Sequence, residues 1–150
     1  MTSEQLIQII QYIADDSRKL KDKYLKPDEA TNIEYLTIFP KSDGEFKKLN
    51  ITARKIAKKL DENNGTVYEL DKPVLTFSGK LKIFRIRKYY PDRNERGCAD
   101  YKASDYQSIR GTYIKQYPSI FSVIDRPLFE MTEIKDSSFD TRVYFVQDKK

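Results

Sequence analysis

The chain has 150 residues, a length typical of one compact domain, with 39% hydrophobic residues, 34% charged residues and a formal net charge of +5. It carries enough Tyr, Phe, Ile and Leu to form a core, which excludes a disordered chain, and no apolar run is long enough to cross a bilayer. One cysteine and no histidine exclude an internal disulfide, a multi-cysteine metal site and hydrolytic triads built on histidine.

The first 25 residues predict an amphipathic helix. Thr2 and Gln5 have the spacing of a capping box, and apolar residues then recur every three or four positions. Residues 33–39 are rich in β-branched and aromatic side chains and predict a strand. Apolar residues at helical spacing over 46–60 predict a second helix, with its lysines and arginines on the other side.

The next part of the chain reads as a meander of strands followed by a loop. Short runs of β-branched and aromatic residues predict strands over 66–70, 74–77 and 81–88. A charged loop over 89–97 leads to a short strand over 98–103. Beyond it, Ser104 and Gln107 repeat the capping-box spacing and predict a third helix that ends near Gln116. Three further strands are predicted: 120–124, 128–134 and 142–146.

This order of elements predicts an α+β protein with a mostly antiparallel, curved sheet. We expect one domain over 1–150, made of an N-terminal helix (1–25), a βαβββ-like unit (33–103) and a final helix with strands (104–146). The stretch from 33 to 103 resembles the vicinal-oxygen-chelate superfamily, the glyoxalase and bleomycin-resistance proteins, whose βαβββ units curl into a cup. Residues 34–38 would be the first strand of the unit and residues 98–101 the last.

The resemblance implies a candidate metal site. Enzymes of that superfamily hold a divalent metal through His, Gln or Glu side chains that point into the cup. Glu34 and Asp100 stand where such ligands would lie, with Glu130 or Glu133 as a third. Because histidine is absent, the site would be rich in oxygen and would suit Mg²⁺, Mn²⁺ or Ca²⁺. The alternative is that these acids pair with nearby arginines or face water.

The strongest positive feature is a local concentration of basic residues. The segment from Lys80 to Arg96 carries seven Lys and Arg residues and two acids, an excess of five that equals the net charge of the whole chain. Alternation along the strand 81–88 places Arg85 and Arg87 on one face. Guanidinium groups suit carboxylate or phosphate, and an adjacent tyrosine can stack on a ring. The predicted ligand-binding residues are Arg85, Arg87, Tyr89, Arg93 and Arg96.

Three classes of function remain. The first is a non-catalytic binding module for an anionic small molecule or a nucleic-acid phosphate, and its structural alternative is an internal arginine–carboxylate network. The second is a metal-dependent enzyme of the vicinal-oxygen-chelate kind. The third is a protein-interaction domain, with a homodimer as one form. The single cysteine, Cys98, and the lack of a signal-peptide pattern favour a cytoplasmic location and no membrane partner. We assign no catalytic residue.

Overall fold

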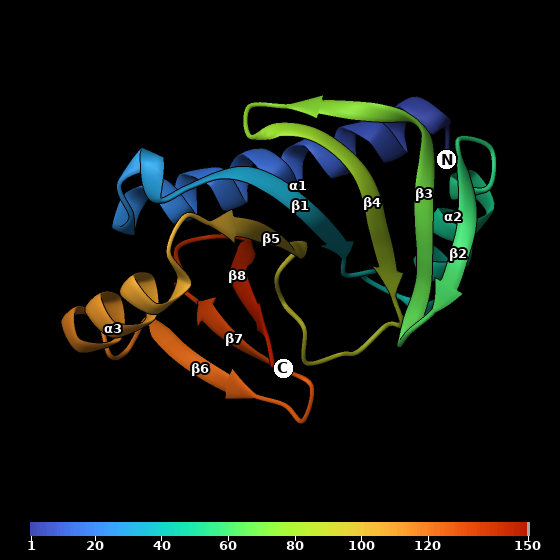
Figure 1. The fold of residues 1–150 in the computed structure, drawn as a ribbon. Helices are drawn as coiled ribbons and strands as arrows, with labels where there is room; N and C mark the ends of the chain where they lie inside the picture. The colour runs from blue at the N-terminus through green and yellow to red at the C-terminus, as the bar shows by residue number, and fades with distance from the viewer. Residues whose placement is uncertain (150) are drawn as a thin grey trace.

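The computed structural model describes residues 1–149 and confirms the α+β class, with three α-helices around one sheet (Figure 1). The helices are α1 (Ser3–Tyr24), α2 (Asp43–Ala53) and α3 (Tyr106–Gln116), with a short 3-10 turn at Pro27–Glu29. The strands are β1 (Ala30–Ile38), β2 (Ala57–Glu62), β3 (Gly65–Thr76), β4 (Gly79–Arg87), β5 (Gly97–Ala103), β6 (Phe121–Asp125), β7 (Phe129–Ile134) and β8 (Thr141–Asp148). No helix in this described part is long and apolar enough to span a membrane.

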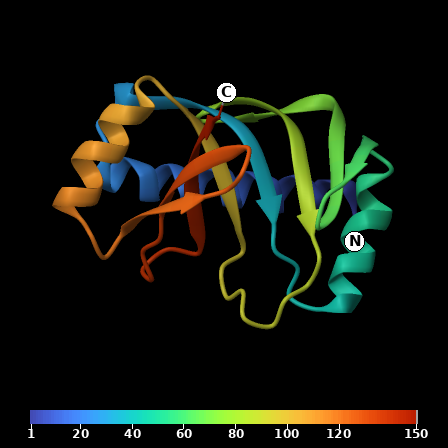
Figure 2. The ribbon, with the colours of Figure 1, turned by 60° about the horizontal axis from the view of Figure 1, so that its bottom comes forward.

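The order of strands in the sheet, β2-β3-β4-β1-β5-β8-β7-β6, divides it into two halves of the same topology. In one half β1 pairs in parallel with β4, and in the other β5 pairs in parallel with β8. Each half is a βαβββ unit, one over 30–87 and the other over 97–148. Figure 2 shows α2 and α3, the helices of the two units, at opposite ends of the sheet. The antiparallel β1–β5 ladder joins the units in the middle.

This topology corrects the grouping predicted from element order alone. The predicted βαβββ unit ran from 33 to 103, with Cys98–Tyr101 in its last strand. In the structure that strand is β5, which begins the second unit. The order of elements along a chain does not reveal which strands pair, and β5 pairs with β1 and β8, both distant in sequence.

The long helix α1 covers the outer face of the sheet. Its predicted capping box is present: the Gln5 amide donates to Thr2 Oγ1 (3.1 Å), and the Thr2 amide donates to Gln5 Oε1 (2.8 Å). The apolar stripe of the helix is fully buried and shares one core with the outward side chains of the strands, such as Phe84 and Ile86. The core residues that α1 contributes are Leu6, Ile10, Ile13 and Leu20.

Two predicted boundaries are wrong, for reasons of backbone pairing. The second helix ends at Ala53, because residues 54–56 turn the chain and 57–62 become the edge strand β2 on β3. Leu60 fits helical spacing yet is 47% exposed. The two predicted strands over 66–77 are one strand, β3, with an irregularity in its pairing with β4.

The cap of the third helix also differs from the prediction. Asp105 caps α3, because its carboxylate accepts from the Ser108 amide (3.2 Å). The predicted cap residue, Ser104, instead donates its hydroxyl to the Glu29 carbonyl (3.1 Å). This contact ties the start of α3 to the turn that precedes β1.

Candidate functional site

The face of the sheet opposite α1 holds a cavity of about 730 Å³, within the range of small-molecule sites. It is bordered by both βαβββ units, since every strand from β4 to β7 in the sheet order contributes to its wall. The polar groups of interest on this wall are Glu34, Thr37, Arg85, Arg87, Arg93, Asp100, Glu133, Arg142 and Tyr144.

The register of the strands sets these groups in rows. Arg85 lies opposite Thr37, Thr37 opposite Cys98, and Cys98 opposite Arg142, so that four neighbouring strands carry one continuous row. The row is symmetric about the β1–β5 ladder. Arg85 and Arg142 therefore occupy equivalent places in the two units, one on β4 and the other on β8.

The arginine of the second unit is already neutralised. Arg142 donates from Nε to Glu95 Oε2 (2.7 Å), from Nη2 to Glu95 Oε1 (3.2 Å) and from Nη1 to Glu133 Oε2 (3.4 Å). Tyr144 also donates its hydroxyl to Glu133 Oε2 (2.7 Å). Burial opposes the charge, but the hydrogen bonds and charge of Glu95 outweigh it and raise the pKa of Arg142. Arg142 is thus part of a closed internal network.

Arg85 and Arg87 of the first unit, and Arg93 of the loop that follows it, are not neutralised in this way. Among residues 1–149, no carboxylate lies within ion-pair distance of Arg85, Arg87 or Arg93. Arg85 donates from Nη1 to the Asn63 carbonyl (3.2 Å). Three buried nitrogens, Arg85 Nε, Arg87 Nε and Arg93 Nη1, have no hydrogen-bond partner within the described part of the chain. Buried donors of this kind are normally satisfied, so these three N–H groups are available to donate to an acceptor on a ligand.

Aromatic rings hold two of these arginines in place. The Arg87 guanidinium lies 5.7 Å from the centre of the Phe39 ring and 5.2 Å from that of Tyr90. Arg93 lies 5.5 Å from the centre of the same Phe39 ring. Burial, followed by the nearby charges of Arg93 and Arg85, lowers the pKa of Arg87. The cluster is therefore held together by ring contacts while its charges repel one another.

Two of the predicted ligand-binding residues lie apart from this cluster. Arg96 donates from Nη1 and Nη2 to Glu45 Oε1 and Oε2 (2.7 and 3.2 Å) and from Nη1 to the Phe39 carbonyl (3.1 Å), so it joins the loop before β5 to the start of α2. Tyr89 does not line the cavity. Its neighbour Tyr90 lies against Arg87 and donates its hydroxyl to Asn64 Oδ1 (2.6 Å).

The acids predicted as metal ligands are not gathered into one group in the described part of the chain. Glu34 and Asp100 line the cavity, but Glu133 is engaged by Arg142 and Tyr144. Glu130 lies outside the cavity, where it accepts hydrogen bonds from Tyr106 and Arg110. Within residues 1–149, no three His, Cys, Asp or Glu side chains are grouped so that they could hold a metal ion. The side chains present therefore do not fit Mg²⁺ or Mn²⁺.

Asp100 is the acid of the cavity whose pKa is raised. Burial raises its pKa to about 7, the charge of Arg85 opposes this shift, and the charge of Glu34 adds to it. Near neutral pH the carboxyl is thus protonated in a large fraction of molecules. The neighbouring Cys98 is buried, which raises the pKa of its thiol to about 12 and makes it a poor nucleophile at neutral pH.

Sequence reasoning missed the contributions of β8. Its alternation over 142–146 places Arg142, Tyr144 and Val146 on the cavity side, while Val143 and Phe145 are fully buried on the other side. The alternation was visible in the sequence, but the partners of Arg142 were not, because Glu95 lies 47 residues away along the chain. To find these partners, one would need to know which distant segments of the chain meet in the folded protein.

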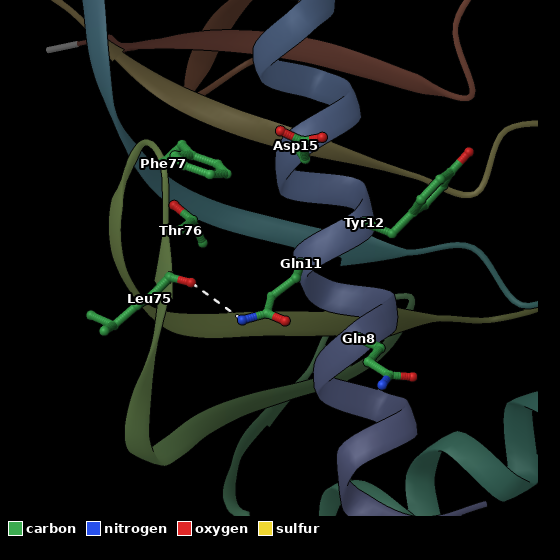
Figure 3. Close-up of a pocket in the computed structure, with 7 residues that line it drawn as sticks. All are labelled: Gln8, Gln11, Tyr12, Asp15, Leu75, Thr76 and Phe77. Atoms are coloured by element: carbon green, nitrogen blue, oxygen red, sulfur yellow. Dashed lines mark hydrogen bonds between the residues drawn. The ribbon is translucent and has the colours of Figure 1, made fainter.

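A second hollow, of about 590 Å³, lies on the other face of the molecule, between α1 and the end of β3 (Figure 3). Its one acid, Asp15, is paired with Arg18 (2.8 Å) and Lys19 (3.2 Å), and Arg18 in turn lies over the Phe77 ring. The charges of this hollow are matched internally. The arginine-lined cavity is therefore the better candidate site.

Comparison with known proteins supports the fold. No family model matches the chain, and no curated protein matches it in sequence. Among solved structures it is similar to a structural-genomics target, Protein EC4020, with a TM-score of 0.68 and 12% identity over 89% of this chain and 81% of that chain. It is also similar to a glyoxalase/bleomycin resistance protein/dioxygenase superfamily member from Vibrio splendidus 12B01, with a TM-score of 0.50 and 6% identity over 76% of this chain and 97% of that chain.

A glyoxalase I mutant from Zea mays gives a TM-score of 0.44 and 13% identity over 80% of this chain and 44% of that chain. The similarity to the Vibrio splendidus protein, at a TM-score of 0.50, confirms at the level of the fold the resemblance to the vicinal-oxygen-chelate superfamily that element order predicted. A shared fold supports many functions, so the function has to be argued from the site.

Proposed function

We propose that this chain is a non-catalytic binding module that holds an anionic small molecule in the cavity of its sheet through Arg85, Arg87 and Arg93. The observation that carries the proposal is the contrast between two equivalent arginines. Arg142 is closed off by two carboxylates, whereas Arg85 and its neighbours have none within ion-pair distance in the described chain. An anion that binds there would satisfy buried donors and relieve the repulsion among three cations.

The shape of the site favours a small molecule over a nucleic-acid backbone. The free guanidinium groups share one cavity, which is partly open to solvent, with the acids Glu34 and Asp100. Binding to a nucleic-acid backbone generally uses a basic groove that follows several phosphates, and acids in its path would oppose it. Arg96, which would have extended the basic segment along the surface, is bound to Glu45.

The proposal can be tested by calorimetric titration of the protein with inorganic phosphate, sulfate and methanesulfonate. We expect Arg85→Ala and Arg87→Ala each to weaken binding by about tenfold or more, because each loses a charged hydrogen bond worth about 1.5–3 kcal/mol. Arg110→Ala is the matched control, since it removes the same charge from an ion pair with Glu130 outside the cavity. Circular dichroism would establish that all three variants remain folded.

Two results would contradict the proposal. One is a wild-type protein that binds none of the three anions, and the other is unchanged binding in both cavity variants. A single-stranded oligonucleotide should bind weakly, and its binding should not compete with methanesulfonate. Tight oligonucleotide binding that falls steeply with added salt would instead point to phosphate-dominated recognition of nucleic acid.

A further inference from the structure

The cavity has two chemically different ends. Three arginines without a carboxylate partner in the described chain, Arg85, Arg87 and Arg93, lie at the β4 end, on the strand and on the loop that follows it. At the opposite end, apolar side chains from β6, β7 and β8 line the wall and are only partly covered by protein. They are Ile124, Phe129, Met131 and Val146.

These apolar side chains form one continuous wall with the interior. Ile124 and Met131 pack against a small buried cluster of Phe39, Cys98 and Tyr144. Val146, on the same face of β8 as Tyr144, is 43% exposed. Phe39 also supports Arg87 and Arg93 through its ring, so one cluster lies beneath both ends of the cavity. The apolar wall and the cationic wall are therefore held in a fixed relation.

The strand order sets the spacing of the two ends. In the sheet, β4 is followed by β1, β5, β8 and β7, so the arginines of β4 are four strand spacings from Met131 on β7. At about 4.8 Å a spacing, this is about 19 Å along the sheet, and the curvature of the sheet shortens the direct path. A small inorganic anion would satisfy the arginines and leave the apolar wall uncovered, whereas an elongated molecule would reach both.

Two acids between the ends of the cavity, Glu133 and Asp100, do not require a positive charge on the ligand. Glu133 is neutralised by Arg142 and hydrogen-bonded by Tyr144. Asp100, whose pKa is raised to about 7 mainly by burial, is protonated in a large fraction of molecules at neutral pH and could then donate a hydrogen bond to the bound acid. Arg126, near the apolar end, is exposed and donates to the neighbouring Asp125 carbonyl (3.2 Å).

We infer that the ligand is an amphipathic anion, an acidic head joined to an apolar chain or ring, with its head on Arg85, Arg87 and Arg93 and its apolar body on Met131 and Val146. This inference rests on the proposed function and narrows it to a class of ligand. It requires that affinity grow with the apolar part of the molecule and that the two ends of the cavity control separate parts of that affinity.

The test is a calorimetric titration with linear alkylsulfonates, from methanesulfonate to octanesulfonate, below the concentrations at which they form micelles. Sulfonates keep their charge at every pH used, so the protonation of Asp100 does not alter the probe. We expect affinity to rise with chain length by up to about fourfold per methylene that becomes fully buried. Arg87→Ala should weaken the binding of every member of the series by a similar factor.

The variants at the apolar end should act differently. Met131→Gln, which nearly conserves volume, and Val146→Thr, which conserves shape, should flatten the dependence on chain length and leave the affinity for methanesulfonate unchanged. Leu128→Gln is the matched control, because Leu128 is 77% exposed beside β7 and does not line the cavity. Two variants at the apolar end are used so that a folding defect in one of them does not decide the result.

The outcomes separate this inference from the proposed function. Binding of methanesulfonate with no gain along the series would overturn the amphipathic ligand and leave the anion site standing. No binding by any sulfonate or by phosphate would overturn both. Octanesulfonate binding that is unaffected by Arg87→Ala would show apolar binding without an anionic anchor, and would also reject the inference.

Discussion

Replacing Arg87 with methionine should make the free protein more stable and remove its response to anions. Arg87 is half-buried, has no carboxylate partner in the described chain and lies close to two other cations. Replacing even a buried ion pair with apolar side chains is often neutral or gains about 1–4 kcal/mol, and Arg87 has no carboxylate partner in the described chain to lose. The loss of two ring contacts, with Phe39 and Tyr90, costs about 0.5–1 kcal/mol each. We expect a net gain of about 1 kcal/mol in the free energy of unfolding.

The assay is urea denaturation followed by circular dichroism, in a buffer without anionic ligands and again with added sulfate. At ten times its dissociation constant, a bound anion should stabilise the wild-type protein by about 1.4 kcal/mol and the Arg87→Met variant by almost nothing. The difference between the two proteins should therefore vanish or reverse when sulfate is added.

Arg142→Met is the opposing control for this experiment. Loss of the Arg142 guanidinium leaves the Glu95 and Glu133 carboxylates without their cation, although these side chains are only 11–13% exposed. We expect a loss of about 3 kcal/mol or more, with or without sulfate. The reasoning is refuted if Arg87→Met is less stable than wild type by more than about 1 kcal/mol in the anion-free buffer. In that case Arg87 would already have an adequate internal partner.

Three further predictions concern pH and packing. Because the folded-state pKa of Asp100 is raised to about 7, its contribution to stability should be full below the usual Asp range and be lost as pH rises from that range to about 7. Methanesulfonate binding should weaken as the carboxyl ionises around pH 7, and Asp100→Asn should remove both dependences. Gly97→Ala should lower the free energy of unfolding in urea by about 3 kcal/mol, because the added Cβ would lie 2.2 Å from the Thr37 carbonyl oxygen. Gly111→Ala is the control: no atom lies within 4 Å of its added Cβ, so this variant should be neutral or stabilising. Asp136 accepts hydrogen bonds from Tyr24 and Lys23 of α1, which lower the pKa of the Asp136 carboxyl. The stability that these bonds add should be full above the usual Asp range and be lost on acidification, and Asp136→Asn should make stability less dependent on pH in acid.

Local patterns were sufficient for the features that depend on near neighbours. The capping box and apolar spacing of the first 25 residues predicted α1 almost to the residue. Strict alternation along β4 placed Arg85 and Arg87 on one side of the sheet, and both line the cavity. These predictions succeeded because side-chain direction in a regular strand or helix follows from spacing alone.

The features that failed depend on contacts between distant parts of the chain. Arg96 had the same composition signal as Arg93, yet its partner Glu45 lies 51 residues away and removes it from the site. Residues 57–62 kept helical spacing as far as Leu60 but form a strand, because pairing with β3 satisfies their backbone. The second βαβββ unit was hidden for the same reason, since it is defined by the parallel pairing of β5 with β8.

The outer strand β2 bears on how these molecules behave at high concentration. One edge of the sheet ends at β2, where Lys58, Lys59, Asp61 and Glu62 are all exposed. An outermost strand leaves backbone amides and carbonyls open to another chain, and closely spaced charges of both signs make that docking unfavourable. Replacing Lys58 and Lys59 with threonine should therefore promote fibre-like aggregation that the natural sequence resists.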